Sequence, residues 1–425
     1  MEPLKHVNFH AYLIGVDIKM SNQSWSAEES VVELGELCKT AGLVVKGHYI
    51  QKRNSIHTGT YIGKGVIEEL QEIIKAEAIE VVIADDELTP SQLRNLEQLL
   101  NVKIMDRTST VLTIFAKHAR THESMLQVEI AQLNYLLPRL TRMWTHLSRL
   151  GGGIGTKGPG ETQLEVDRRQ INTKMKHLKK DLKKIIQHRE TIRQKRTDIP
   201  LVTAALVGYT NSGKSTLMNR LTPAKVLAED QLFATLDTTT RKLNLPNNET
   251  ILVSDTVGFI QKLPTQLVDA FKSTLEELHY ADILIHVVDA SHPRCFDMMD
   301  ITLQTLAEIG VTDKPQLIVM NKRDKLSKDD RLSLKERMEL FEHSVLFSAQ
   351  EDTELSPIVD SLSELIESFR IEKQYTIPYS RMDIVNLLHK FGDVLDEEYT
   401  DSIHITVRIN KVVGEKIMGK LNQAN

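Results

Sequence analysis

One glycine-rich stretch constrains the fold of this 425-residue chain more than any other feature. Residues 208–215 read G-Y-T-N-S-G-K-S and match the phosphate-binding pattern G-x-x-x-x-G-K-[ST] at every fixed position. The run before it, 201–207, is short and apolar like a buried strand, and a helical pattern begins at Ser215. A strand, a glycine loop and a helix in this order are the context that the motif requires, so the pattern predicts a nucleotide site in an α/β domain.

Each part of this loop has a physical task. The glycines allow successive backbone N–H groups to turn toward phosphate oxygens, and the N-terminus of the following helix adds the positive end of its dipole. Lys214 is expected to reach the outer phosphates, and Ser215 is expected to ligate Mg²⁺. The residues predicted to hold the nucleotide here are Gly208, Tyr209, Thr210, Asn211, Ser212, Gly213, Lys214, Ser215 and Thr216.

The composition indicates a multidomain globular protein in a reducing compartment. Hydrophobic residues make up 41% of the chain, which is enough for real cores, and the length predicts about two to four domains. The two cysteines, Cys38 and Cys295, can form neither a disulfide framework nor a Cys-rich zinc site. The N-terminus lacks a signal-peptide pattern, and no apolar run reaches the roughly 18 residues of a membrane span. A cytoplasmic protein is therefore expected.

Residues 1–122 are expected to form an α/β domain, because short apolar segments alternate with helical patterns and favour parallel strand pairing. The loop 58–65, T-G-T-Y-I-G-K-G, resembles a phosphate loop, but its glycine spacing is too short and no Ser or Thr follows Lys64. We interpret it as a turn that leads into the next helix; a second nucleotide site or an RNA contact is the alternative. The acidic run 85–87 suggests a metal, but we favour a role at the helix start near Thr89.

Residues 123–196 are predicted to form an antiparallel helical hairpin. Apolar residues at helical spacing run through 123–147, where Pro138 is expected to kink the helix, and the helical pattern resumes at Glu161. The glycine-rich segment 151–160 between them can be neither helix nor strand. The second helix carries many basic side chains and few acidic ones: Arg168, Arg169, Lys174, Lys176, Lys179, Lys180, Lys183, Lys184, Arg193, Lys195 and Arg196. A solvated helix surface would explain an ordinary charge run, but the one-sided sign favours a polyanion such as nucleic acid.

Residues 197–370 are predicted to form a Rossmann-like three-layer domain that binds its ligand at the carboxyl ends of the strands. Residues 371–425 are expected to be a small C-terminal α+β domain without a chemical signature. The fold class is therefore multidomain α/β, with a phosphate-loop domain at its centre.

Two further motifs follow predicted strands and identify the nucleotide. The first is D-x-x-G, formed by Asp255, Thr256, Val257 and Gly258; it places a carboxylate near the metal and the Gly258 amide near a γ-phosphate. The second is N-K-x-D, formed by Asn321, Lys322, Arg323 and Asp324. A carboxylate there accepts from guanine N1–H and its exocyclic amine, whereas adenine has an acceptor at N1, so GTP is predicted over ATP. Ser348 and Ala349 follow the last predicted strand of the domain and fit a loop that supports the base.

The segment 232–240 is expected to supply a threonine that closes over Mg²⁺ and the γ-phosphate. Its candidates are Thr235, Thr238 and Thr239.

These motifs resemble the translation-factor-related branch of Ras-like GTPases, and the N-terminal half narrows the match to the HflX family. The segment 151–165, G-G-G-I-G-T-K-G-P-G-E-T-Q-L-E, looks like the signature of that family, and 61–65, 85–88 and 126–140 match it as well. The resemblance implies a ribosome-associated GTPase that contacts the large subunit and ribosomal RNA. Several members are implicated in separating stalled or idle ribosomes under stress.

The resemblance also implies roles for particular residues. It selects Thr235 as the switch threonine, so that Lys214, Thr235 and Gly258 act on the transferred phosphoryl group. Ser215, Thr235 and Asp255 would then surround Mg²⁺. Thr238 departs from the family pattern, which usually has proline at that position.

Two functions from different classes fit these residues. The first is a monomeric GTP-hydrolysing ribosome factor whose basic hairpin contacts ribosomal RNA. The second is a regulatory GTPase that signals through a protein partner and uses the hairpin as an oligomerisation coiled coil. In either case Phe259 follows D-x-x-G, where Ras-like proteins often have a water-orienting glutamine, so slow intrinsic hydrolysis is expected. Asn211 either helps to hold K⁺ beside the phosphates, as in related GTPases, or braces the loop.

Overall fold

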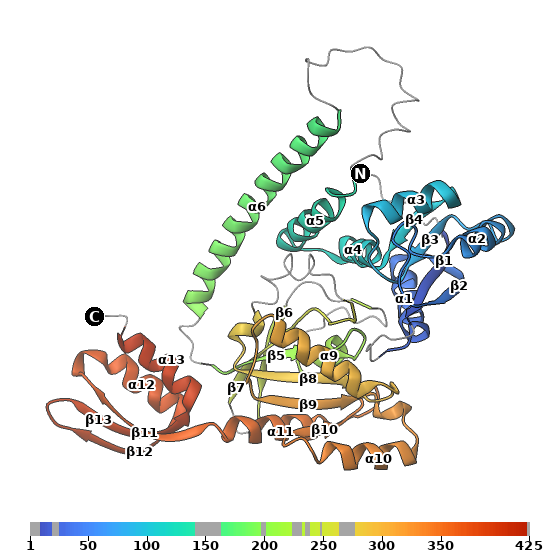
Figure 1. Ribbon diagram of the computed structural model, residues 1–425. Coiled ribbons are helices and arrows are strands. Elements are labelled where there is room, and N and C mark those ends of the chain that lie inside the picture. The colour runs from blue at the N-terminus through green and yellow to red at the C-terminus, as the bar shows by residue number, and fades with distance from the viewer. Residues whose placement is uncertain are drawn as a thin grey trace. The chain divides into compact units, whose positions relative to one another are not determined.

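The computed structural model describes residues 9–18, 25–140, 163–196, 201–222, 232–233, 239–246, 249–262 and 277–422 (Figure 1). The chain divides into two compact units, each of which is described by itself. The first comprises Met1–Ile185, Gln231–Leu236 and Lys262–Lys272, and the second comprises Ile186–Asp230, Asp237–Gln261 and Ser273–Asn425.

The first unit is built on a four-stranded sheet in which every neighbouring pair of strands is parallel. The strand order is β2-β1-β3-β4, and the α/β domain with parallel pairing that the sequence predicts is confirmed. Parallel strands need crossover connections, and helices supply them here. The strands are β1 (His10–Ile18), β2 (Val44–Arg53), β3 (Val81–Ala84) and β4 (Lys103–Asp106). The helices are α1 (Ala27–Ala41), α2 (Lys64–Ala76), α3 (Pro90–Leu100), α4 (Arg107–His118) and α5 (His122–Leu136).

The loop 58–65 is a turn that leads into α2, with Gly63 at the N-cap position. The imidazole Nδ1 of His57 accepts the backbone N–H groups of Gly59 (3.3 Å) and Thr60 (3.2 Å). Gln51 Oε1 accepts the Gly63 N–H at 2.8 Å. The turn is thus held by side chains of its own unit.

The acidic run after β3 serves neither of the roles considered for it. Thr89 caps α3 itself, and Gln92 completes the capping box, so the preferred role of residues 85–87 at this helix start was wrong. Within the described residues, no group of three or more His, Cys, Asp and Glu side chains is arranged to hold a metal ion. The carboxylates of Asp85 and Asp86 instead bind cations, because Lys262 Nζ lies 2.6 Å from an oxygen of each.

Arg107 is the centre of this buried ionic cluster. Its guanidinium lies 2.6 Å from Asp85 Oδ1 and 2.7 Å from Glu33 Oε2, and its side chain is 2% exposed. Burial raises the pKa of Asp85, but Arg107 and Lys262 outweigh it and the net pKa is lowered. Arg107 thereby joins α1, β3 and α4 through charges that water does not reach.

The two predicted hairpin helices are present, with different bounds. Helix α5 ends at Leu136, two residues before Pro138, and residues 141–147 of the longer helix predicted to kink there lie outside the described residues. Residues 141–162, including the glycine-rich segment 151–160, lie outside the described residues. Helix α6 (Gln163–Arg196) runs back in the opposite direction (Figure 1), and Lys174 Nζ lies 2.5 Å from Glu129 Oε1 of α5. Among the described helices, α6 included, none is both long and apolar enough to span a bilayer.

The second unit contains a six-stranded sheet with strand order β10-β9-β8-β5-β7-β6, parallel except at β6. This agrees with the Rossmann-like prediction. The strands are β5 (Thr203–Val207), β6 (Thr239–Asn244), β7 (Thr250–Asp255), β8 (Ile283–Asp289), β9 (Gln316–Asn321) and β10 (Ser344–Leu346). The helices are α7 (Lys214–Leu221), α9 (Cys295–Glu308), α10 (Lys328–Met338) and α11 (Ser356–Glu367).

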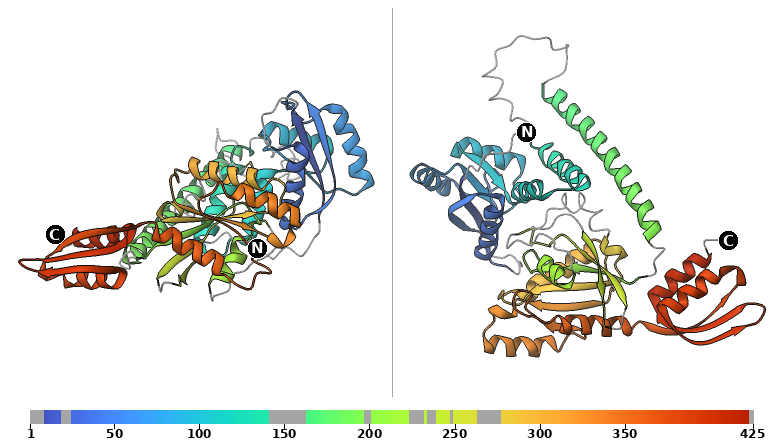
Figure 2. Two further views of the ribbon diagram at one scale, coloured as in Figure 1. Left: turned by 90° about the horizontal axis from the view of Figure 1, so that it is seen from below. Right: turned by 180° about the vertical axis from the view of Figure 1, so that it is seen from behind.

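The C-terminal part of the second unit is a three-stranded antiparallel sheet with order β11-β13-β12. Helices α12 and α13 cover one face of it (Figure 2). Its elements are β11 (Arg370–Ile377), α12 (Met382–Phe391), β12 (Gly392–Tyr399), β13 (Ile403–Asn410) and α13 (Lys411–Asn422). These strands and helices give the α+β mixture that the sequence predicts for residues 371–425, and the first strand begins one residue earlier, at Arg370. One continuous apolar cluster runs from the six-stranded sheet into this part, from Val202 to Ile417.

We expect Arg107→Ala to destabilise the first unit strongly. The variant leaves the buried Glu33 carboxylate without its cation and leaves Asp85 with Lys262 alone, which costs about 3–5 kcal/mol of unfolding free energy. Urea unfolding followed by far-UV circular dichroism measures the change. Lys75→Ala, which removes an exposed cation from α2, is the control and should shift stability by less than about 0.5 kcal/mol. A loss of under about 1 kcal/mol for Arg107→Ala would contradict the structural role of the cluster.

Candidate functional site

Five loops of the second unit meet at the carboxyl edge of its parallel strands. The glycine-rich loop follows β5, the D-x-x-G loop follows β7, and N-K-x-D follows β9. Ser348 lies just after β10, and Asp289 ends β8. Adjacent strands of one parallel sheet place these motifs together, as the fold predicts for a ligand site.

The backbone of the glycine-rich loop requires glycine at two positions. Gly208 has φ +145°, and a Cβ there would lie 2.1 Å from the carbonyl oxygen of Val287. Gly213 has φ +97°, and its Cβ would lie 2.2 Å from Asn321 Nδ2. Both the left-handed backbone and the close neighbours therefore exclude a side chain. The loop is built against β8 and β9, so the motif depends on its sheet.

Lys214 is buried at the N-terminus of α7. Its ammonium donates to the carbonyl oxygens of Gly208 at 3.0 Å and Tyr209 at 2.8 Å. Burial lowers the pKa of Lys214 to about 8, although the carboxylate of Asp255 opposes the shift. The hydroxyls of Thr210 and Ser212 are buried and have no hydrogen-bond partner in the described part of the chain. Buried donors beside a cation are the groups that an anion would satisfy.

Two of the three predicted metal residues, Ser215 and Asp255, lie within reach of one another. Ser215 Oγ donates to Asp255 Oδ2 at 2.9 Å, and Asp255 is fully buried at the end of β7. Thr256 Oγ1 donates to the Leu206 carbonyl at 2.6 Å, which fixes the start of the D-x-x-G loop to β5. A Cβ on Gly258 would lie 3.0 Å from Lys214 Nζ, so this glycine lies beside the lysine.

One of the three candidates for the switch threonine lies among the described residues. Thr235 and Thr238 lie outside the described residues. Thr239 begins β6 and pairs with Asp255 across the antiparallel ladder.

Phe259 is tied to the glycine-rich loop through its backbone. Its N–H donates to the Gly208 carbonyl at 3.1 Å, and its carbonyl accepts the Thr210 N–H at 2.7 Å. The phenyl ring is 1% exposed. The residue therefore joins two loops of the site and offers no side-chain polar group to it. Asn211, by contrast, has an exposed side chain and φ +57°.

The side of the site predicted to hold the base is a connected hydrogen-bond network. Asn321 Nδ2 donates to the Ser212 carbonyl at 2.8 Å, and Asn321 Oδ1 accepts the Ala349 N–H at 2.9 Å. Ser348 Oγ donates to Asp324 Oδ1. Lys322 has φ +61°. Asn321 therefore connects the glycine-rich loop to the loop after β10, and the carboxylate of Asp324 is held by Ser348.

Three residues of this network were missed by sequence reasoning. Asp289 accepts Lys322 Nζ at 2.7 Å, and Asp352 accepts the Ser348 N–H at 2.7 Å. Arg220 of α7 donates to the Ala349 carbonyl at 3.1 Å. Asp289 could have been found from its place at the end of a buried strand. Arg220 carries no sequence signal, since only the tertiary fold brings α7 to the loop. Asp352 is four residues from Ser348 in the same loop, but no motif marks it.

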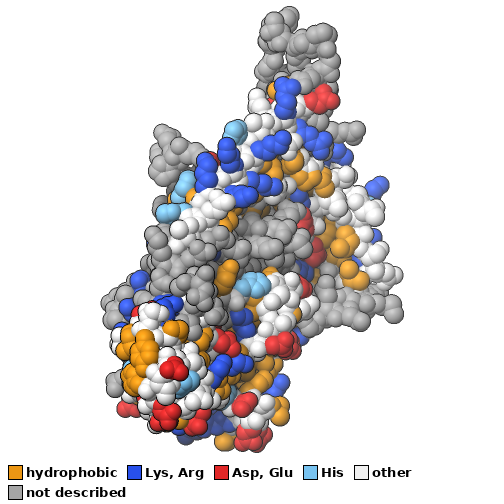
Figure 3. Space-filling model, turned by 90° about the vertical axis from the view of Figure 1, so that its left-hand side faces the viewer, with side chains coloured by type: hydrophobic (Ala, Val, Ile, Leu, Met, Phe, Trp, Pro, Cys, Tyr) orange, Lys and Arg blue, Asp and Glu red, His pale blue; other side chains and the backbone are white. Residues whose placement is uncertain are grey.

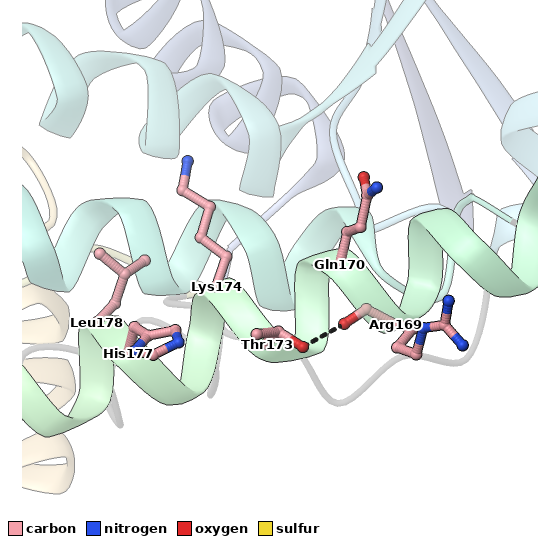
Figure 4. Close-up of a pocket in the computed structure, with 6 residues that line it drawn as sticks. All are labelled: Arg169, Gln170, Thr173, Lys174, His177 and Leu178. Atoms are coloured by element: carbon pink, nitrogen blue, oxygen red, sulfur yellow. Dashed lines mark hydrogen bonds between the residues drawn. The ribbon is translucent and has the colours of Figure 1, made fainter.

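A second candidate surface lies on α6, in the first unit up to Ile185. Its apolar stripe is buried or half-buried, with Met175 7% exposed, while the basic side chains from Arg168 to Lys184 are exposed. Figure 3 shows blue Lys and Arg side chains gathered along this helix, with few red ones. A hollow of about 480 Å³ lies on it and is lined by Arg169, Gln170, Thr173, Lys174, His177 and Leu178 (Figure 4).

Three family models match consecutive parts of the chain. Residues 28–116 match the model described as GTP-binding GTPase N-terminal, and residues 118–196 match GTP-binding GTPase Middle Region. Residues 203–322 match the model described as 50S ribosome-binding GTPase.

Similar proteins cover most of the chain. It is 46% identical over 398 residues to the GTPase HflX of Lacrimispora saccharolytica, covering 94% of this chain and 92% of the relative. It is 43% identical over 392 residues to the GTPase HflX of Caldanaerobacter subterraneus subsp. tengcongensis, covering 92% and 90%. Among solved structures, a GTP-binding protein from the archaeon Sulfolobus solfataricus in complex with GDP is 29% identical, covers 84% of this chain and 98% of its own, and has a TM-score of 0.44.

We expect Gly213→Ala to weaken GDP binding by more than about tenfold. The left-handed backbone and the contact with Asn321 each cost of order 1–3 kcal/mol when a Cβ is added. Titration calorimetry with GDP measures the loss. Gly419→Ala, where no atom lies within 4 Å of the new Cβ, is the matched control. Unchanged GDP affinity in Gly213→Ala would show that nucleotide binds elsewhere.

Proposed function

Since this chain belongs to the HflX family of GTPases, we propose that it hydrolyses GTP on the large ribosomal subunit. That it is a GTP hydrolase follows from its relatives and its GTPase domain, and the resemblance found in its motifs is confirmed. The one-sided basic surface of α6 carries the ribosome proposal. The family described as a 50S ribosome-binding GTPase, which residues 203–322 match, supports it.

The basic surface of α6 suits ribosomal RNA in particular. Its exposed cations extend over several turns of a single helix, so they can follow a phosphate backbone rather than one small anion. Arg169 and His177, which line the hollow on this helix, add hydrogen-bond donors at one point along that path (Figure 4). Each lysine or arginine that neutralises a phosphate releases a counterion, which favours binding.

We assign the nucleotide roles as follows. Lys214 and the loop 208–216 hold the phosphates, and the Gly258 amide contacts the γ-phosphate. Ser215 and Asp255, joined at 2.9 Å, fit as the residues that would hold Mg²⁺, with Thr235 as the switch ligand. Bound Mg²⁺ would neutralise charge on the phosphate oxygens. Asp324 reads the guanine edge.

Hydrolysis needs help from outside the site. Phe259 has no group to orient water, and its ring is buried, so another residue, a cation or the ribosome must supply what is missing. We propose that Asn211 of the phosphate loop helps to hold K⁺, and its exposed side chain is consistent with that role. In the cell, the cycle would serve to separate or recycle ribosomes under stress, and the protein would act as a monomer.

We expect charge reversal on α6 to weaken binding to the large subunit without affecting nucleotide affinity. Lys179→Glu with Lys183→Glu removes up to two phosphate contacts, so the slope of log K against log salt should fall by roughly 1.5. Co-sedimentation with 50S subunits over a salt series measures this. Lys328→Glu with Lys335→Glu on α10 is the matched control. If the two double variants showed the same slope of log K against log salt, α6 would not contact ribosomal RNA and its basic surface would be an ordinary solvated helix face.

We expect basal GTP hydrolysis to be slow and to rise with ribosomes. It should rise further in K⁺ relative to Na⁺, and Asn211→Ala should abolish that difference, because the amide oxygen would be lost as a cation ligand. Steady-state phosphate release, measured with and without 50S subunits in each salt, tests both parts. A fast basal rate that ribosomes leave unchanged refutes the partner argument. Equal rates in K⁺ and Na⁺ remove Asn211 from the mechanism.

A further inference from the structure

The loop after β10 is held by an aspartate that belongs to none of the nucleotide motifs. Asp352 Oδ2 accepts the backbone N–H of Ser348 at 2.7 Å, and the Asp352 N–H donates to the Ser348 carbonyl at 3.0 Å. Its other oxygen, Oδ1, accepts Arg323 Nη2. The Asp352 side chain is 15% exposed. It therefore closes the turn at Ser348 from both sides.

Ser348 passes this constraint to Asp324. Its hydroxyl oxygen accepts the Glu351 N–H at 3.1 Å, so the hydroxyl hydrogen is free to point elsewhere, and it is donated to Asp324 Oδ1. Ser348 is fully buried, and water does not compete for these bonds. The orientation of the Asp324 carboxylate thus depends on a turn that Asp352 holds.

Two arginines fix the turn to the rest of the domain. Arg220, on the helix that follows the phosphate loop, donates to the carbonyl oxygens of Ala349 (3.1 Å), Asp352 and Thr353 (3.4 Å). Arg323 occupies the position that N-K-x-D leaves open, and its guanidinium binds Asp352. The arginine at this position of the motif therefore binds the loop after β10 through Asp352.

We propose that Asp352, clamped by Arg323, is a positioning residue that sets the selectivity of this GTPase for guanine. A carboxylate that accepts both N1–H and the exocyclic amine must lie in the plane of the base, with both oxygens correctly aimed. If the Ser348 turn relaxes, Asp324 rotates and the bond to the exocyclic amine weakens. The inference rests on the proposed role of Asp324 as the guanine reader.

The test compares GDP with IDP, which lacks the exocyclic amine. In Asp352→Ala the ratio of GDP affinity to IDP affinity should fall by about threefold to tenfold, because a hydrogen bond to a charged group is worth about tenfold to a hundredfold in affinity. Asp352→Asn keeps an acceptor for Ser348 but loses the ion pair, so it should lie between wild type and Asp352→Ala. Arg323→Ala should lower the ratio, and Arg323→Lys should restore part of it.

Glu351→Gln is the matched control, since it neutralises an exposed acid in the same turn and should leave the ratio unchanged. Melting temperatures of all variants identify any that fail to fold. A folded Asp352→Asn and Arg323→Ala that keep the wild-type ratio within about twofold would overturn the inference, even if both nucleotides bind more weakly. Asp324→Asn separates this from the parent proposal, because it should shift preference toward xanthine nucleotides; wild-type protein that does not distinguish GDP from IDP overturns both.

Discussion

A hydrogen bond between Asn321 and Ser212 joins the phosphate loop directly to the N-K-x-D motif. Asn321 Nδ2 donates to the Ser212 carbonyl at 2.8 Å, directly over the position where Gly213 lacks a side chain. The bond requires the glycine, because any Cβ would displace the amide. It also requires β5 and β9 to lie in one parallel sheet, so that the phosphate loop and N-K-x-D face each other. Neighbouring contacts adjoin this bond: Asn321 also accepts the Ala349 N–H, and Lys322, the next residue, pairs with Asp289.

The first unit uses the carboxyl edge of its own parallel sheet differently. The acidic run after β3 meets Arg107 and Lys262 there, and buried ion pairs take the place that a ligand would have in many such folds. Such pairs add little net stability over an apolar core, but each partner becomes costly to remove. The same physical element, a parallel sheet edge, therefore serves phosphate binding in one unit and structural cohesion in the other.

Helix α6 and the C-terminal sheet differ in which of their faces are exposed. Along α6 an apolar stripe is covered while lysines and arginines remain exposed, which leaves a long cationic face for a polyanion. The C-terminal sheet is instead continuous with the core of the GTPase domain, and Lys416 of α13 donates to the Leu201 carbonyl at 2.9 Å. The sequence suggested a separate small domain there. The spacing of apolar residues in β11, β13 and α13 predicts which face of each element is buried, but it does not show that these faces join the core of the six-stranded sheet.

The sequence by itself determined the fold class, the three nucleotide motifs and the basic helix, because each depends on spacing along the chain. Glycine at a left-handed turn, an apolar strand before it and a carboxylate at a strand end are local requirements. They can therefore be recognised from residue types at fixed spacing in the sequence. Only the tertiary structure decided where distant partners meet: Lys262 binds Asp85, and Arg220 binds the loop after β10. These pairs are separated by up to 177 residues, and an ion pair or hydrogen bond between distant residues leaves no periodic trace in the sequence, since its geometry exists only once the sheets have formed.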